Sequence, residues 1–518
     1  MPDAYHNGRT LTGKRWKSAT LRGNGWRRAG FGLGLAMLPL VLGSCENTRS
    51  IASDATQIDG FRAGVVADEP RAALIGRTVI SNGGNAADGV VAAYFAMAVT
   101  MPSAAGLGGG GICIAHNAEE KTTDVIDFLP RAAAAGQVAI PGNVRGMAAL
   151  NARYGNLPFA GLVGPAENLA LTGAPLSKAL ARDLQQYDSL LRDDPTISTV
   201  FHRLDGSLIG DGENFRQTDL GASLGQVRAQ GVNAFYSGLL GQKIVEGAQA
   251  IGAPLTIDDL RNFKVQIYPP VEAQFTDISL FVPPPPASGG VLVAQAVELL
   301  AGGDNSPSGQ AAISRQLMAA RSQWMQADGS STQAPAEIVS RQAVQQMAQQ
   351  PSVTLPTENP SAASVVAVDS DGNAVACAFT MNAPFGAART AQGTGIILSP
   401  APNDQGIGYS ALAPVIVASK YNGELYFASA AAGGVPGALA EALVLDAVMR
   451  RAQPLDQAMQ MPRAFDAGAG ETFDENSGLR LGRLNSIFCS RGVPSSPDSC
   501  QLRNDYRGNG LATILGEE

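Results

Sequence analysis

The sequence has few of the residues from which metal sites are usually built. Among 518 residues there are three histidines and five cysteines, and no histidine lies near Cys489 and Cys500, the two cysteines closest to each other. A structural zinc site needs four such ligands at short spacing. The sequence therefore predicts no metal site, and it predicts no other cofactor. It also lacks an internal repeat, which argues against solenoid and propeller architectures.

The leader lacks an apolar run long enough to cross a membrane. Its apolar run, 29–42, has about fourteen residues, whereas a transmembrane helix needs about 20. Basic residues precede this run, which is the pattern of a signal peptide. Leu-Gly-Ser-Cys at 42–45 then matches a bacterial lipobox. We expect residues 1–44 to be removed and Cys45 to be lipidated, with a short transmembrane anchor as the alternative.

Basic residues are scarce in the rest of the chain. The whole sequence has 37 basic and 45 acidic residues and a formal net charge of −8. Seven of the basic residues and one acidic residue belong to the leader, so the mature chain is near −14. Such a surface repels nucleic acid and anionic lipid heads. The sequence predicts an exported, periplasm-facing lipoprotein of a Gram-negative-type bacterium, which contacts the membrane only through its lipid.

Four cysteines remain besides Cys45. Cys489 and Cys500 lie eleven positions apart in a segment rich in Gly, Pro and Ser, and the chain is expected to be exported. These features predict a disulfide, which would contribute roughly 3 kcal/mol to stability by loop closure. Cys113 and Cys377 lie in apolar, strand-like segments, where we expect inert core residues.

Hydrophobic periodicity predicts one layered body made of helices and strands. The segments 45–301 and 361–518 are expected to form one structural unit. The segment between them, 302–360, is rich in Gln, Ser and Ala, and we expect it to be an exposed polar connector. The segment 85–100 is apolar almost all round and predicts a buried helix. Further helices are predicted at 158–171, 177–191, 239–250, 313–326, 335–350 and 437–450, and strands at 112–116, 123–128, 365–369, 374–381, 415–419 and 425–430.

Several motifs, in the same order along the chain, resemble those of the γ-glutamyltranspeptidase family. They are Gly-Leu-Gly-Gly-Gly-Gly at 106–111, Pro-Gly-Asn-Val-Arg-Gly-Met at 141–147, Asp-Gly-Asn-Ala-Val at 371–375 and Ala-Gly-Gly at 432–434. The resemblance implies an α+β fold, the four-layer αββα sandwich of N-terminal-nucleophile hydrolases. It also implies a small γ-glutamyl or amide ligand.

The nucleophile of that family is missing. Family members carry Thr-Thr-His-x-Ser-Val-Val-Asp, and the first Thr cuts the chain before itself and then acts as the nucleophile. Here the run at 360–369 reads Pro-Ser-Ala-Ala-Ser-Val-Val-Ala-Val-Asp. An ungapped count puts Ala362 at the nucleophile position, and a one-residue-shorter alignment puts Ala363 there. Ser364, about 6.6 Å along the same face, and Ser361, on the opposite face, could substitute only after a register shift.

The resemblance implies roles for other residues of the site. Thr380 corresponds to a second threonine that steadies the nucleophile, and Asn382 corresponds to a residue that contacts the γ-glutamyl group. Alternation along the strand places both on one face, with Ala376 and Ala378, toward the cleft. Gly433 and Gly434 correspond to the pair whose backbone amides form the oxyanion hole.

The residues expected to anchor the substrate are altered. Leu129 stands where the family has the Arg of Asp-Phe-Arg, which binds the α-carboxylate, and Arg131 is the nearby candidate to replace it. Asp404 falls where the family has an acid for the α-amino group. Ser410 corresponds to the first of two adjacent serines, of which the second is replaced by Ala411.

Two hypotheses follow from these differences. In the first, the protein is an amidohydrolase or transferase for γ-glutamyl compounds such as glutathione, and it uses Ser364 or Ser361. In the second, it is a catalytically silent relative that keeps the cleft and ligand binding. A change of substrate to another acyl-amide would explain Leu129 but not Ala362.

Overall fold

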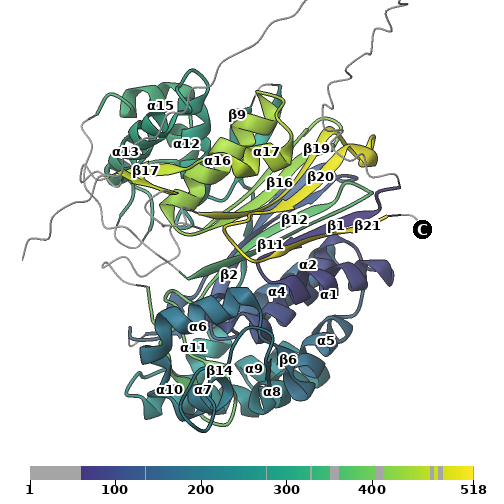
Figure 1. Cartoon of the computed structure of the whole chain (residues 1–518), viewed down its shortest axis with the longest axis vertical. Coiled ribbons are helices and arrows are strands. Elements are labelled where there is room, and N and C mark those ends of the chain that lie inside the picture. Colours follow the sequence, from purple (N-terminus) through teal and green to yellow (C-terminus); the bar gives the residue numbers. More distant parts are fainter. Residues whose placement is uncertain are drawn as a thin grey trace, which may run out of the picture. The chain divides into compact units, whose positions relative to one another are not determined.

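The structure is a computed structural model, which describes residues 60–516 apart from 135, 276, 327–328, 351–360, 403–411, 467–471 and 476–481. Two antiparallel sheets form its centre, with the strand orders β21-β1-β11-β12-β2-β3-β8 and β20-β19-β16-β15-β10-β9 (Figure 1). The first contains β1 (Ala63–Ala67), β2 (Gly110–Asn117), β3 (Thr122–Phe128), β8 (Gln266–Tyr268), β11 (Ala362–Asp369), β12 (Ala374–Thr380) and β21 (Leu511–Leu515). The second contains β9 (Val271–Phe275), β10 (Ile278–Val282), β15 (Ala413–Ala418), β16 (Leu425–Ala432), β19 (Arg483–Val493) and β20 (Cys500–Asn504).

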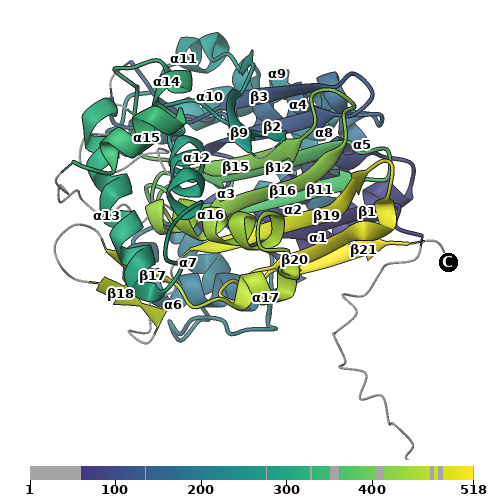
Figure 2. The ribbon, with the colours of Figure 1, turned by 90° about the horizontal axis from the view of Figure 1, so that it is seen from above.

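Helices cover the outer face of each sheet, so the fold has four layers (Figures 1 and 2). The first sheet packs on α1 (Pro70–Ser81), α2 (Ala86–Thr100), α4 (Asn143–Tyr154), α5 (Phe159–Thr172), α8 (Thr218–Gln230), α9 (Val232–Tyr236) and α10 (Leu239–Ala250). The second packs on α12 (Gly289–Leu300), α13 (Pro307–Trp324), α16 (Val435–Met449) and α17 (Leu455–Gln460). This arrangement confirms the expected αββα sandwich.

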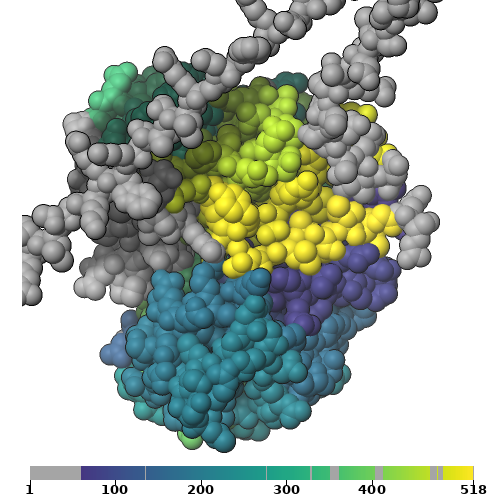
Figure 3. All heavy atoms as spheres, in the orientation of Figure 1, coloured from purple at the N-terminus to yellow at the C-terminus, as the bar shows by residue number. Residues whose placement is uncertain are grey.

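Short strands and further helices complete the two helical regions. In the described part of the chain, no helix combines the length and apolarity that a membrane span requires. Figure 3 shows the C-terminal strands, in yellow, exposed beside the purple N-terminal segment. The further elements are α3 (Pro102–Ala105), α6 (Lys178–Leu191), α7 (Pro195–Phe201), α11 (Ile257–Asn262), α14 (Pro335–Ile338), α15 (Arg341–Met347), β4 (Arg131–Ala132), β5 (Ala139–Ile140), β6 (Ala174–Pro175), β7 (Asn214–Phe215), β13 (Thr390–Ala391), β14 (Ile396–Ile397), β17 (Ala464–Asp466) and β18 (Thr472–Asp474).

Helix α2 is buried along its whole length, as the sequence predicts. Asn85 and Asp88 form a capping box at its start, which satisfies backbone N–H groups that the helix cannot pair internally. The Asp88 carboxylate also accepts hydrogen bonds from Asn151 Nδ2 and from the backbone of the segment after α4. A buried carboxylate is stable only with such partners, and here they fix the start of α2 against α4 and the segment after it.

The side chains of β11 and β12 alternate between two buried faces, as predicted. Val365 and Phe379 belong to the apolar layer between the first sheet and its helices. Ala362, Ala376 and Ala378 belong to the layer between the two sheets. The expectation that the small residues face a cleft is wrong for Ala376 and Ala378, because the second sheet packs directly on them. Small side chains allow the two sheets to approach closely.

The segment expected to be an exposed connector is largely folded. Leu317 and Trp324 of α13 are buried in the same apolar layer as α12 and α16. The predicted helix 335–350 is instead two helices, α14 and α15, because Ser340 caps the second one by accepting a hydrogen bond from the Ala343 N–H. Most polar residues in these helices lie on their outer faces. The inner face of each helix carries a narrow stripe of apolar residues, which is buried.

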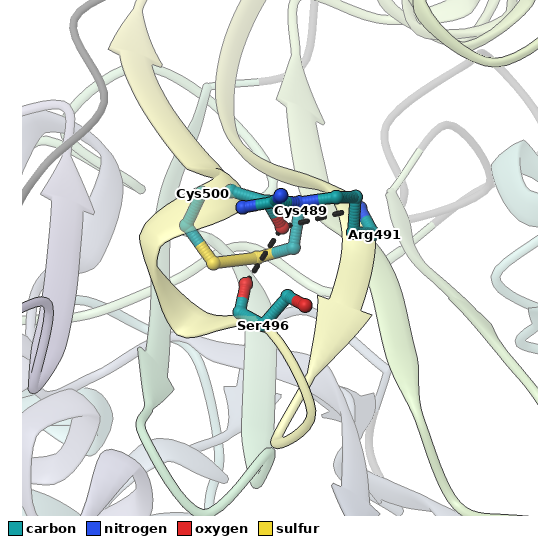
Figure 4. The surroundings of a disulfide bond; sticks show 5 residues. Cys489, Arg491, Ser496 and Cys500 are labelled. Atoms are coloured by element: carbon teal, nitrogen blue, oxygen red, sulfur yellow. Dashed lines mark hydrogen bonds between the residues drawn. A yellow bond between two sulfur atoms is a disulfide. The ribbon is translucent and has the colours of Figure 1, made fainter.

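Two disulfides tie neighbouring strands. Cys489 and Cys500 are bonded between β19 and β20, as predicted (Figure 4). Beside them, Ser499 Oγ accepts a hydrogen bond from the Arg491 N–H. The expectation that Cys113 and Cys377 are inert is wrong, because they form a second disulfide. They face each other in the antiparallel register of β2 and β12, with Cα atoms 4.1 Å apart. Sequence alone does not reveal this register.

Candidate functional site

The candidate site lies at one end of the two stacked sheets. In the first sheet, Ala362 at the start of β11 faces Thr380 at the end of β12. In the second sheet, Arg483 at the start of β19 faces Ala432 at the end of β16, and the glycine pair follows Ala432. Arg483 Nη2 donates to Ala362 O at 2.7 Å, which joins the two sheets at this point.

Thr380 lies opposite Ala362 and contacts the peptide bond that precedes it. The Thr380 hydroxyl donates to Ser361 O at 2.7 Å and accepts from the Asn382 N–H at 2.9 Å. Its hydroxyl therefore contacts the carbonyl of the peptide bond between Ser361 and Ala362. Ala363 instead faces Phe379 and points into the apolar layer beneath the first sheet. The geometry thus favours the ungapped alignment.

The hydroxyl groups of both neighbouring serines are bonded to residues other than Thr380. Ser364 is fully buried; its N–H donates to Asp68 Oδ2 at 2.9 Å, and its Oγ accepts from Asn485 Nδ2 at 2.7 Å. Ser364 also faces Ala378, which is two residues before Thr380. Ser361 uses its hydroxyl to bond the carbonyl oxygen of Ser103. Both hydroxyls therefore hold the start of β11 in place, and neither occupies the nucleophile position in this register.

The glycine pair forms a tight turn between β16 and α16. Gly433 and Gly434 have φ values of 105° and 74°, which favour glycine. The turn packs against Gly482: a Cβ added to Gly433 would lie 3.1 Å from the Gly482 Cα. This close packing leaves no room for side chains behind the turn. A turn of this kind, leading into a helix, presents backbone N–H groups to an anion or a polarised carbonyl.

A buried ion pair supports the glycine turn from behind. Arg463 Nη1 donates to Gly482 O at 3.1 Å, and Arg463 Nη2 pairs with Asp505 at 2.7 Å. Burial lowers the pKa of the Arg463 guanidinium, and Asp505 opposes this effect. Sequence reasoning missed both residues, because nothing in their local sequence distinguishes them from ordinary surface charges. Their role comes from the packing of the segment before β17 against the start of β19.

In the described part of the chain, Asn382 carries a buried acceptor without a partner. Its backbone has a φ of 60°. Its side chain is buried, and Nδ2 donates to Pro400 O at 2.9 Å. Among the residues that the structure describes, none donates to the buried Oδ1. A buried acceptor without a partner costs about 1–3 kcal/mol. A ligand N–H group would satisfy it.

The predicted anchor Arg131 is engaged elsewhere. Its guanidinium pairs with Asp127 at 2.9 Å and lies over the ring of Phe263. It makes no hydrogen bond or ion pair with Ala362, Thr380 or Asn382. Leu129, at the family's arginine position, is buried between the sheets. Asp404, Ser410 and Cys45 lie outside the described residues.

The fold is that of the N-terminal-nucleophile hydrolases, with the γ-glutamyltranspeptidase type of αββα sandwich. The family model for gamma-glutamyltranspeptidase matches residues 72–478. The chain belongs to this family, which confirms the resemblance seen in the sequence.

Its relatives include both glutathione hydrolases and acylases. The chain is 28% identical over 383 residues to the glutathione hydrolase proenzyme of Escherichia coli, covering 65% of this chain and 66% of that one. It is 27% identical to the acylase ACY 1 proenzyme of a Pseudomonas species (strain V22), covering 79% and 83%. The chain spans about half to two thirds of the glutathione hydrolases that it matches. The cephalosporin acylase of Bacillus halodurans has the same fold, with a TM-score of 0.75, 18% identity, and coverage of 89% of this chain and 97% of that one.

Proposed function

We propose that this protein is a non-cleaving, catalytically silent member of the family that binds a small γ-glutamyl or related amide ligand at this end of the two sheets. The observation that carries this proposal is the position of Ala362. Its methyl group lies beside Thr380, whose hydroxyl is bonded to the Ser361 carbonyl. Self-cleavage and turnover both require a hydroxyl at this position to attack a carbonyl carbon, and alanine has none.

Ligand binding is supported by the parts of the site that remain. The Gly433–Gly434 turn offers backbone donors, and Asn382 Oδ1 offers a buried acceptor. An amide ligand has both a carbonyl oxygen and an N–H group, so it matches this pair of requirements. The relatives named as glutathione hydrolases and acylases suggest the range of ligands, from γ-glutamyl compounds to other acyl-amides.

We expect the purified protein to remain one chain across the peptide bond between Ser361 and Ala362. Intact-mass spectrometry after several days at 37 °C should show no C-terminal fragment starting at residue 361, 362 or 364. Such a fragment would contradict the proposal and would favour the alternative, an enzyme that uses Ser361 or Ser364. A mutation of the corresponding serine to alanine would then identify the nucleophile.

We further propose that the protein is a periplasm-facing lipoprotein anchored through Cys45. The support is the lipobox at 42–45 after a basic and then apolar leader. Cys45→Ala, or inhibition of the lipoprotein signal peptidase, should change the fractionation of the protein or leave an unprocessed leader. Metabolic labelling with a palmitate analogue checks this directly. Wild-type protein without label, or a C45A variant that still carries it, would refute the anchor.

A further inference from the structure

Arg483 is a partly buried cation at the centre of the site. It lies on the face of β19 that points toward the first sheet, and its Nη2 donates to Ala362 O at 2.7 Å. In the described part of the chain, the buried Nε atom has no hydrogen-bond partner. No carboxylate of a described residue forms an ion pair with the guanidinium either.

The neighbouring buried arginines, Arg463 and Arg507, form ion pairs with carboxylates. Arg483 differs from them, because it forms no ion pair with a described residue. Arg463 and Arg507 both pair with Asp505, at 2.7 and 3.0 Å, and Arg507 also pairs with Glu475. Removing a cation from water without a counter-charge is unfavourable. The chain therefore compensates two of the three cations in this region with its own acids.

The acid that directly follows β1 is hydrogen-bonded to the start of β11. Asp68 lies beside the start of β11, and its Oδ2 accepts the Ser364 N–H at 2.9 Å and the Ser364 hydroxyl at 3.4 Å. A Cβ added to Gly508 would lie 3.6 Å from the Arg483 Cδ and 3.8 Å from the Asp68 Oδ1. Asp68 and Arg483 thus flank the same glycine without forming an ion pair. The unused donors of Arg483 remain at the end of the sheets, next to Ala362.

We propose that Arg483 adds a carboxylate-binding group to the former reaction centre, so that among γ-glutamyl ligands the site prefers the free γ-carboxylate over the matching γ-amide. A guanidinium binds carboxylates through a planar fork of N–H groups. The Gly433–Gly434 turn follows Ala432, the residue opposite Arg483, which places the turn at the same end of the sheets. A neutral amide would leave the Arg483 charge uncompensated.

This inference rests on the proposed function, since it names the ligand class of the same site. L-Glutamate and L-glutamine are suitable probes, because they differ only in the γ-carboxylate and the γ-amide. Isothermal titration calorimetry of wild-type protein at low salt should show glutamate binding about 10- to 100-fold more tightly, as expected for one charge-assisted contact. Glutamine binding as tightly as glutamate, or more tightly, would overturn the inference and leave the proposed function in place. Binding of neither probe would contradict both.

Three variants test whether Arg483 is responsible. Arg483→Gln should reduce the preference for glutamate to less than twofold, and Arg483→Lys should retain part of it because the charge remains. Arg503→Gln is the matched control, because Arg503 is an exposed arginine on the neighbouring strand β20 and its loss changes the net charge equally. R483Q that keeps the full preference, or R503Q that removes it, would overturn the assignment. If R483Q does not fold, the wild-type comparison and R483K still decide the question.

Discussion

Ala362→Thr is expected to restore self-cleavage between residues 361 and 362, and intact-mass spectrometry should reveal a new C-terminal chain that begins at position 362. The new hydroxyl would attack the Ser361 carbonyl carbon. The carbon–nitrogen bond breaks, the proton passes to the amide nitrogen, and water then hydrolyses the resulting ester. Thr380 already donates to the Ser361 carbonyl oxygen at 2.7 Å, where negative charge would develop.

The neighbouring residue provides the control for this experiment. Ala363→Thr adds the same atoms one position along, but Ala363 points into the apolar layer beneath the first sheet, so no cleavage is expected. Adding Thr380→Ala to Ala362→Thr should slow cleavage about 100-fold or more, because it removes a donor to the developing oxyanion. A folded A362T protein that stays intact for days, or cleavage in A363T, would mean that the register of β11 at the site is different.

Removing the Cys113–Cys377 disulfide should destabilise the protein more than removing Cys489–Cys500. The first bond closes a loop with a sequence separation of 264, and the second one of 11. By loop-closure entropy, the losses are about 6 and about 3 kcal/mol. Urea unfolding of C113A/C377A and C489A/C500A should therefore show the lower midpoint for the first pair.

The two pairs are well matched for this comparison. All four cysteines are almost completely buried, and each pair joins adjacent antiparallel strands. Substitution by alanine thus removes a similar amount of packing in both variants, while loop length differs strongly. Mass mapping under non-reducing conditions confirms that each wild-type bond is present. Equal midpoints, or a lower midpoint for C489A/C500A, would contradict the expectation.

Much of the fold could be predicted because its signals are local. The apolar segment 85–100 predicts the buried helix α2, and alternation in 374–381 predicts β12 with its two faces. The connector was harder to predict, because Leu317 and Trp324 are among few large apolar residues in a segment rich in Gln, Ser and Ala. Their burial depends on α12 and α16, which lie on either side of the segment along the chain.

The sequence by itself determined the family, the leader pattern and the absence of a hydroxyl at positions 362 and 363, because each depends only on which residues occur in which order. The tertiary structure decided which alanine lies beside Thr380, that Cys113 meets Cys377, and that Arg483 reaches Ala362. These contacts join segments 18 to 264 positions apart. They depend on strand register and on the packing of one sheet against the other, and a single sequence carries no local signal for either.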